Sequence, residues 1–576
     1  MGLINQALQV GRSALLSYQS ALQIVGNNIS NAGSPDYTRQ TPGLSPLNSP
    51  AIPEGMRPGS GVALTSLKRN LDEALENRVR SAMGSSESSI TQHQALSQVE
   101  ALFDPSTGVP LASRTTEFFN AMSQVQNAPN DIASRQLAIA AGTNLADALR
   151  QMRTSLAELG EGFNSQIDSL VTSANDLAQR IAGLNTEIVK AESAGSPASA
   201  LRDQRDALIR DLSEIVNVSV KPQANGSANV YIGNESLVDG GVSRGLAVTA
   251  RLDGEFQRDD VVFADNNSQV AIRGGQLEGL ITARDNAAFS RIADIDRLAA
   301  GVIFEVNRVY ADGQGLTGFT SVTSAYQSAV PTAVLNAAAA GLPFDVTNGS
   351  FYLTTRDATT GGLVSHQIQI DLDGIGDDDT TLESLIADIN DNVTGLTASL
   401  TVDNRLSLTA GAGLEFVFGY DGNAQRQDSS QFLAAMGINT LFDGRNATDI
   451  RVRTSLVAQP DQFAGAAVNL SGDGANAGRL AGVADATSEL LGGQSILDFF
   501  ASSANRVAVD SAAARDNAAS GAAVLGSLQA QKENISGVSL DEEAIELLKF
   551  ERAFQGASRF VSVVDRLADE IINLVN

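Results

Sequence analysis

Both ends of this 576-residue chain predict long amphipathic helices, and this restricts the fold more than any other feature. Near the N-terminus apolar side chains recur in steps of three or four residues, with Gly11 filling one step, at Ile4, Leu8, Leu15, Tyr18, Leu22, Val25 and Ile29. The same spacing returns near the C-terminus at Leu547, Phe550, Phe554, Ala557, Val561, Val564, Ala568, Ile571 and Val575. Such stripes are typical of helices that pack against other helices. We therefore expect an assembly interface at the two ends, with an ordinary intramolecular hairpin as the alternative.

Composition argues against several classes of function. The chain has 39 basic and 66 acidic residues, a formal charge of −27, and no concentrated basic stretch. Phosphate backbones and anionic lipids need clustered positive charge, so we expect no nucleic acid and no membrane insertion. Without cysteine, a disulfide framework or a thiolate metal site is impossible. The first basic residue is Arg12, and the N-terminal apolar residues are periodic rather than contiguous, unlike a cleaved secretory signal.

A helix stop follows the N-terminal stripe. Residues 25–40 read VGNNISNAGSPDYTRQ. Asparagine and glycine tolerate the left-handed backbone at a helix end, and proline prevents the helix from continuing. The residues expected to take part in assembly here are Asn27, Asn28, Asn31, Pro35, Tyr37, Arg39 and Gln40, although the asparagines also serve simple helix termination.

A helix start lies near the other end. Residues 536–543 read SGVSLDEE, a polar cap followed by acidic residues that oppose the positive end of the helix dipole. Together the two terminal motifs resemble those of bacterial flagellar rod, hook and hook-associated axial proteins. The first motif departs from that family at Ser34 and Asp36, where threonine and glycine are usual. Tyr37, Arg39 and Gln40 resemble the hook-associated members rather than the hook or rod proteins, and the resemblance covers roughly residues 1–320 and 445–576.

The resemblance implies a structural component of the bacterial flagellum, without enzymatic activity, at the junction between hook and filament. Implied partners are further copies in a ring, the hook protein, a second junction protein (hook-associated protein 3), a cytoplasmic export chaperone and the flagellar type III export apparatus. The implied location is extracellular, reached without a cleaved signal peptide. Two alternatives stay open: another axial protein, such as a hook or flagellin-like subunit, and a secreted hydrolase carried on an axial scaffold.

Between its ends the chain predicts a multidomain fold, mainly α with inserted β domains. We expect the terminal helices, in residues 1–60 and 530–576, to form an α-helical coiled coil. A long helical rod domain is expected from residues 61–216, 274–320 and 446–529. A period of two in residues 217–273 predicts a small β domain, and residues 321–445 predict an inserted α+β domain that projects outward.

Two patterns resemble functional sites, a calcium site and a hydrolase nucleophile turn, but each lacks features that such a site requires. The acidic run Asp371, Asp373 and Asp377–Asp379 could hold calcium as a weak surface site, although Ile375 and Leu382 occupy expected ligand positions. We expect Thr380 and Glu383 instead to form a capping box for a helix. The segment Gly241–Gly245 spells a hydrolase nucleophile turn, but a strand pattern follows it rather than a helix. The sequence thus predicts no catalytic residue, no metal and no cofactor.

Overall fold

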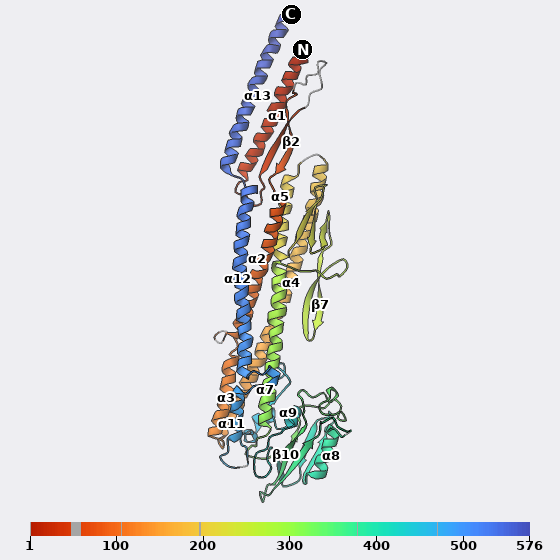
Figure 1. The fold of residues 1–576 in the computed structure, drawn as a ribbon, viewed down its shortest axis with the longest axis vertical. Coiled ribbons are helices and arrows are strands. Elements are labelled where there is room, and N and C mark those ends of the chain that lie inside the picture. The colour runs from red at the N-terminus through yellow and green to blue at the C-terminus, as the bar shows by residue number, and fades with distance from the viewer. Residues whose placement is uncertain are drawn as a thin grey trace. The chain divides into compact units, whose positions relative to one another are not determined.

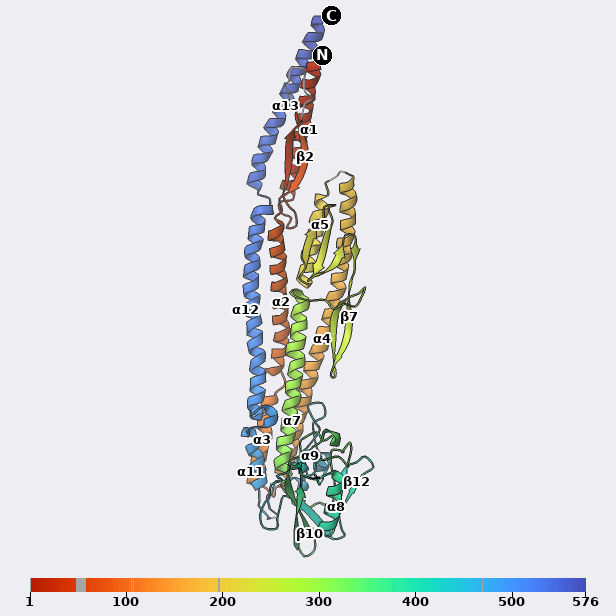
Figure 2. The ribbon, with the colours of Figure 1, turned by 45° about the vertical axis from the view of Figure 1, so that its right-hand side comes forward.

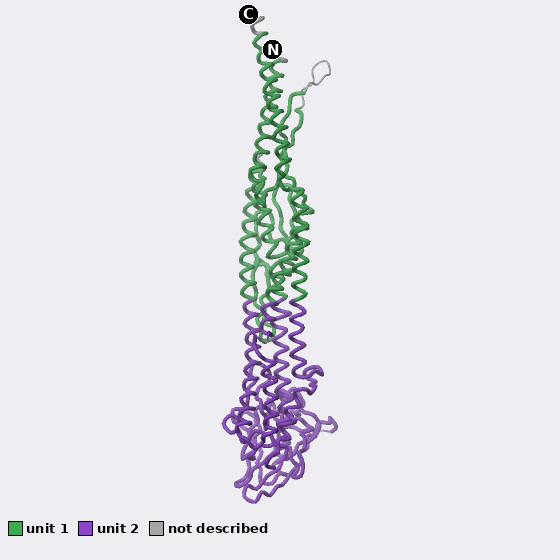
Figure 3. The backbone as a smooth tube through the Cα atoms, turned by 90° about the vertical axis from the view of Figure 1, so that its left-hand side faces the viewer, with its two compact units in different colours: residues 1–95, 163–282, 512–576 green, residues 96–162, 283–511 purple. Residues whose placement is uncertain are grey.

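The computed structural model describes residues 2–47, 59–104, 106, 108–194, 197–376, 378–468 and 470–575. It is 55% helical with several small sheets, which confirms the prediction of a mainly α fold. The chain divides into two compact units, each assembled from separate stretches of sequence (Figure 3). Unit 1 comprises Met1–Ala95, Phe163–Thr282 and Ala512–Asn576, and unit 2 comprises Leu96–Gly162 and Ala283–Ser511.

Unit 1 brings the two chain ends together. Helix α1 (Gly2–Ser30) lies beside α13 (Leu540–Val575), and the two run antiparallel, so the N- and C-termini lie at the same end (Figure 1). Strands β1 (Gln40–Pro46) and β2 (Val62–Arg69) pair antiparallel, with a register shift between Gly43 and Leu44, and pack against α1. We call α1, β1, β2 and α13 together the terminal hairpin.

The rest of unit 1 consists of helices and two small sheets. Its helical segments come from α2 (Glu73–Phe103), α4 (Ile132–Ser193), α5 (Ser199–Ile215), α6 (Gly275–Ala283) and α12 (Ile496–Ser536), and the division between the units falls within α2, α4 and α12. A four-stranded antiparallel sheet has the order β3 (Ser219–Pro222), β4 (Ala228–Ile232), β5 (Glu235–Asp239) and β6 (Val242–Ser243). Strands β7 (Leu246–Asp253) and β8 (Phe256–Phe263) form a separate hairpin. These strands lie where the period of two predicted them.

Unit 2 contains a helical part and a mixed part (Figure 2). Its helices include α3 (Leu111–Asn127), the π-helical turn η1 (Arg284–Phe289), α7 (Ser290–Tyr310), α9 (Phe432–Met436), α10 (Thr454–Ala458) and α11 (Ala475–Gly482). One sheet has the order β11 (Leu363–Ile370), β10 (Gly349–Asp357) and β14 (Leu414–Phe418), and another has the order β12 (Leu396–Leu400), β13 (Leu406–Ala410) and β9 (Ser321–Thr323). Short strands β15 (Phe442–Asp443) and β16 (Arg451–Val452) pair with each other, and α8 (Leu382–Asn392) follows β11. None of the helices in the described residues is long and apolar enough to cross a membrane.

The capping box of α8 lies one residue from where we predicted it. Thr381 is the N-cap: its hydroxyl accepts from the Ser384 amide at 3.1 Å, and the Ser384 hydroxyl accepts from the Thr381 amide at 2.9 Å. Thr380 is not available for this role because its amide donates to the Asp371 carbonyl and its hydroxyl accepts from the Asp371 amide. The prediction that Thr380 and Glu383 cap the helix was therefore wrong.

Candidate assembly site at the chain termini

The predicted apolar stripes of α1 and α13 face each other within one chain. A small core forms from Ala21, Val25 and Phe550, and Tyr18 packs beside it with its ring centre 6.5 Å from that of Phe550. Val564 is also buried, whereas the other predicted stripe residues that the structure describes are half-buried: Ile4, Leu8, Leu15, Leu22, Ile29, Leu547, Phe554, Ala557, Val561 and Ala568. The side chains of Ile571 and Val575 lie outside the described residues. The two stripes therefore contact each other, but most of their side chains are only half-buried.

Small residues place the two helices close together, and sequence reasoning missed their role. Gly11 filled one step of the stripe without contributing an apolar side chain, yet it is buried at the contact. A Cβ atom built on Gly11 would lie 2.4 Å from Cγ2 of Val561. Ala21 is fully buried as well. A glycine or alanine in a helix stripe is a usable signal of close helix approach.

A buried polar cluster joins the end of α1 to the start of α13. The Nδ2 group of Asn28 donates to Oε2 of Glu543 and to the carbonyl of Gln40, both at 2.9 Å. Its Oδ1 accepts from the Tyr37 hydroxyl at 2.7 Å and from the Gln40 amide at 3.1 Å. Asn28 is only 2% exposed, and buried polar groups need hydrogen-bond partners. Its side chain bonds to groups from the loop after α1, from β1 and from α13.

Arg39 completes the cluster. Its Nε donates to Oε1 of Glu543 at 2.7 Å, and its Nη1 donates to Oε2 of Glu542 at 2.7 Å. Glu543 is only 1% exposed, and a buried carboxylate is costly unless it is paired and hydrogen-bonded. Burial, together with the nearby carboxylates of Asp203 and Glu543, raises the pKa of Tyr37 to about 12, so its hydroxyl stays a donor. We define Asn28, Tyr37, Arg39, Gln40 and Glu543 as the terminal cluster.

The remaining residues predicted in this motif, Asn27, Asn31 and Pro35, do not enter the terminal cluster. Asn27 and Pro35 are exposed. The Asn31 side chain donates to the carbonyl of Asn27 at 2.8 Å, so it caps the end of α1. Sequence reasoning gave Glu543 only a helix-dipole role. Its true partner lies at the other end of the chain, and the presence of one polar motif at each end was the available clue.

Helix α13 carries a second apolar stripe whose side chains stay exposed, although the Phe560 ring lies beside Gly11 of α1. The exposed fraction of its members is 65% for Ile545, 53% for Leu548, 43% for Phe560, 47% for Val563 and 49% for Leu567. Neighbouring members are three or four residues apart, except for the longer step from Leu548 to Phe560, so all five lie on one face of the helix. We call these five residues the outer stripe. Exposed apolar patches of this kind mark sites of association.

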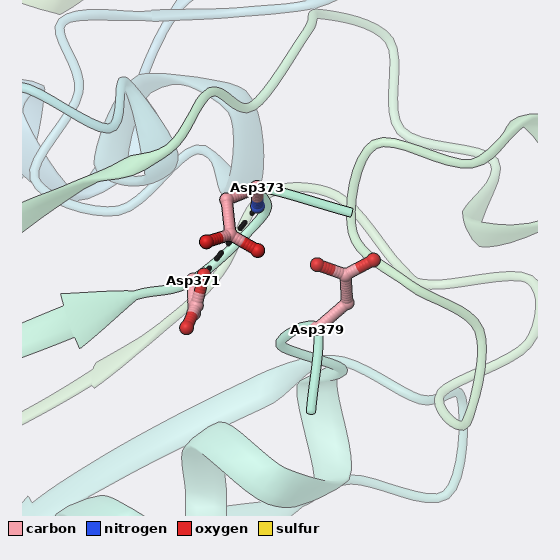
Figure 4. A group of neighbouring side chains, drawn as sticks. All are labelled: Asp371, Asp373 and Asp379. Carbon is pink, nitrogen blue, oxygen red and sulfur yellow. Dashed lines mark hydrogen bonds between the residues drawn. The ribbon is translucent and has the colours of Figure 1, made fainter. Parts of the chain in front are cut away.

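The acidic run forms a small group of carboxylates in unit 2. Asp371, Asp373 and Asp379 each place one carboxylate oxygen within 4.8 Å of the others (Figure 4). These oxygens also accept backbone hydrogen bonds, from Gly374 to Asp379 at 3.1 Å and from Ile375 to Asp373 at 2.8 Å. Asp377 lies outside the described residues. Exposed acidic groups of this kind are common without a metal, so calcium binding stays the untested alternative to the prediction of no metal.

Comparisons with known proteins find flagellar proteins over most of the chain. A family model for the flagellar hook-associated protein FlgK helical domain matches residues 96–323, one for the flagellar basal body rod FlgEFG protein C-terminal matches 529–574, and one for the flagellin hook IN motif matches 360–412. Flagellar hook-associated protein 1 of Salmonella typhimurium is 26% identical over 592 residues, covering 99% of each chain. That of Bacillus subtilis is 25% identical over 573 residues, covering 98% of this chain and 97% of the relative.

Comparison with solved structures also found similar chains. The flagellar hook junction protein FlgK from Burkholderia pseudomallei aligns with 80% of this chain and 100% of its own, at 17% identity and a TM-score of 0.49.

The helical architecture, the joined termini and the terminal motifs define a structural protein of the flagellar axis. Within that class the chain is similar to flagellar hook-associated protein 1, which it matches over nearly its whole length. The resemblance inferred from the terminal motifs is thereby confirmed.

Proposed function

We propose that this protein is a structural subunit of the junction between the flagellar hook and filament, and that it assembles through its terminal hairpin. The near full-length similarity to flagellar hook-associated protein 1 supports the location. The observation that carries the assembly mechanism is the outer stripe of α13, which stays exposed after α13 has packed on α1.

An assembly helix needs two apolar faces. One face of α13 packs against α1 in the same subunit, and the outer stripe would pack against the terminal helices of neighbouring copies. Burial of a large apolar side chain contributes about 1.5–3 kcal/mol, so even partial burial of five such residues contributes several kcal/mol per subunit. In the assembled junction the terminal helices would then form an α-helical coiled coil, as predicted from their spacing.

The four-part domain organisation predicted from the sequence fits this role and is part of the proposal. Residues 1–60 with 530–576 would form the assembly core, and the helical domain would support it. The β domain of residues 217–273 and the insertion of residues 321–445 would face outward. All proposed interface residues that the structure describes lie in the terminal segments and their adjoining loop.

The expected partners follow from the family. They are further copies in a ring, the hook protein, hook-associated protein 3, a cytoplasmic export chaperone and the flagellar type III export apparatus. We propose that the protein is secreted without a cleaved signal peptide and ends extracellularly, at the hook–filament junction. Another axial position, such as that of a hook or flagellin-like subunit, is the alternative.

Gold-labelled antibody on intact flagella of the source bacterium tests the proposed location. We expect labels confined to a narrow band where hook meets filament, and we expect a strain lacking the gene to make hooks without filaments. Label along the filament would instead indicate a filament subunit, and label along the hook would indicate a hook subunit.

A further inference from the structure

Ion pairs join the terminal hairpin to α5. The small apolar core of the hairpin, Ala21, Val25 and Phe550, is distinct from the cluster that Leu75 and Val79 of α2 form with Leu528 of α12. Beside the joint lies a pocket of about 920 Å³. It is lined by the loop after α1, including Asp36 and Tyr37, and by α4 and α5. A joint with a large pocket beside it has fewer packing contacts to fix its geometry.

Arg69, the last residue of β2, is the main ionic contact across this joint. Its Nη2 lies 2.6 Å from Oδ1 of Asp203 and 2.6 Å from Oδ2 of Asp206, both on α5. It also donates to the hydroxyl of Thr38 at 3.3 Å. One nitrogen therefore serves two carboxylates, and Nε of Arg69 is buried without a hydrogen-bond partner among the described residues. This pairing lacks the two parallel hydrogen bonds of the strongest arginine–carboxylate contacts.

A second ion pair acts at the same joint. Arg210 of α5 donates to Oδ1 of Asp36 in the loop that leads from α1 to β1. The carboxylate of Asp36 is largely exposed, whereas Asp203 is buried. Burial raises the pKa of Asp203 even though the charge of Arg69 opposes that shift. The cost of burying Asp203 thus offsets much of the attraction, and the closed joint gains little net stability from it.

We infer that Arg69, Asp203 and Asp206 form an ionic latch that fixes the angle between the terminal hairpin and α5, and that opening it lets the hairpin reorient. The latch selects one angle in the monomer, and its release when neighbouring subunits bind the hairpin rests on the proposed assembly through the hairpin. Residues 70–72 and Gly537–Ser539 connect the terminal hairpin to the rest of unit 1 without helix, which leaves room for rotation. The latch does not depend on the proposed position of the protein in the flagellum.

Distances between two spin labels test this inference in the full chain. The protein has no cysteine, so Gln23→Cys on α1 and Ser173→Cys on α4 give two unique exposed labelling sites in unit 1. In the parent we expect one narrow distance distribution. Arg69→Ala should broaden or shift that distribution while the helical circular dichroism signal stays the same. The matched control is Arg251→Ala, which removes an arginine paired with Asp260 at 2.7 Å on the β7–β8 hairpin.

A second variant guards against misfolding of the first. Asp206→Asn removes one latch carboxylate with almost no change in volume, and it should also broaden the distribution. If either folded variant gives the same distribution as the parent and Arg251→Ala, the latch does not set the angle and the inference is wrong. If Arg69→Ala does not fold, the Asp206→Asn result decides alone.

Discussion

Asn28 and Glu543 are separated by 515 residues and are joined by a 2.9 Å hydrogen bond in the buried terminal cluster. This contact closes the chain on itself near the base of the α1–α13 pair. Both side chains are almost fully buried, so neither can exchange its partner for water. The hairpin alternative considered from the sequence and the assembly interface are therefore compatible: one face of α13 closes the hairpin, and the other is left for association.

Removing the Asn28 side chain should weaken the terminal hairpin selectively. Asn28→Ala leaves Glu543 with Arg39 as its remaining partner in the cluster and leaves the Tyr37 hydroxyl without its acceptor. Buried groups that lose their partners cost about 1–3 kcal/mol each. We expect faster hydrogen exchange in residues 20–40 and 540–555, with little change in unit 2. Asn27→Ala, on the exposed neighbouring position, should leave exchange nearly unchanged, and equal effects of the two variants would contradict the role of the cluster.

Gly11 should be the least tolerant glycine of the helix pair. In Gly11→Ala the new Cβ would lie 2.4 Å from Cγ2 of Val561, and such overpacking costs about 1–3 kcal/mol. A Cβ on Gly556 of α13 would meet no atom within 4 Å. Gly556→Ala should therefore stabilise the helix by about 1 kcal/mol through helix propensity. Hydrogen exchange of α1 and α13 distinguishes the two, and stabilisation by both substitutions would show that the helices do not approach closely at Gly11.

Asp428 should make unit 2 less stable as pH rises. Burial raises the pKa of Asp428 to about 6, and the nearby Asp312 adds to this, although Ser430 and Leu433 donate hydrogen bonds that favour the charged form. The folded state thus holds a proton that the unfolded state, with a pKa near 3.8, releases earlier. The loss of this proton preference decreases the free energy of unfolding by about 3 kcal/mol between about pH 4 and about pH 6.

Urea unfolding at several pH values measures the pH dependence of stability that Asp428 contributes. Other carboxylates titrate in the same range, so the useful quantity is the difference between the parent and Asp428→Asn. We expect the advantage of the parent to be largest at low pH and to shrink as pH rises to about 6. An advantage that stays constant or grows with pH would show that the hydrogen bonds from Ser430 and Leu433 outweigh burial.

Sequence periodicity located most helices and strands because it reports which side of an element is buried. The stripes of α1 and α13, the helix α5 and the strands of residues 217–273 were all visible in this way. Strand β14 within the predicted α+β insertion could not be located from the sequence, since Leu414–Phe418 is a short run without a clear period of two. The cap of α8 was misplaced by one residue because Thr380 and Thr381 are both able to cap, and only the tertiary contact of Thr380 with Asp371 decides between them.

The terminal cluster could be predicted only in part. Asn28, Tyr37, Arg39 and Gln40 were expected to act together, because they share one motif. Their partner Glu543 could not be deduced, since pairing across the chain depends on how α13 docks rather than on local sequence. The outer stripe was also not predicted, because the first apolar stripe of α13 already accounts for a helix with one buried face, and the second stripe marks a further apolar face.

The proposed assembly is tested most directly by the outer stripe itself. Val563→Asp places a charge on the exposed face of α13 and should leave the monomer folded, because the Val563 side chain is 47% exposed. Ser558→Asp, on another exposed position of α13, is the matched control. Immunoblots of purified hook–basal bodies and attached filaments measure incorporation of each exported variant. We predict that Ser558→Asp incorporates like the parent and that Val563→Asp is exported but absent from the flagella. Equal incorporation of both variants would contradict assembly through the outer stripe.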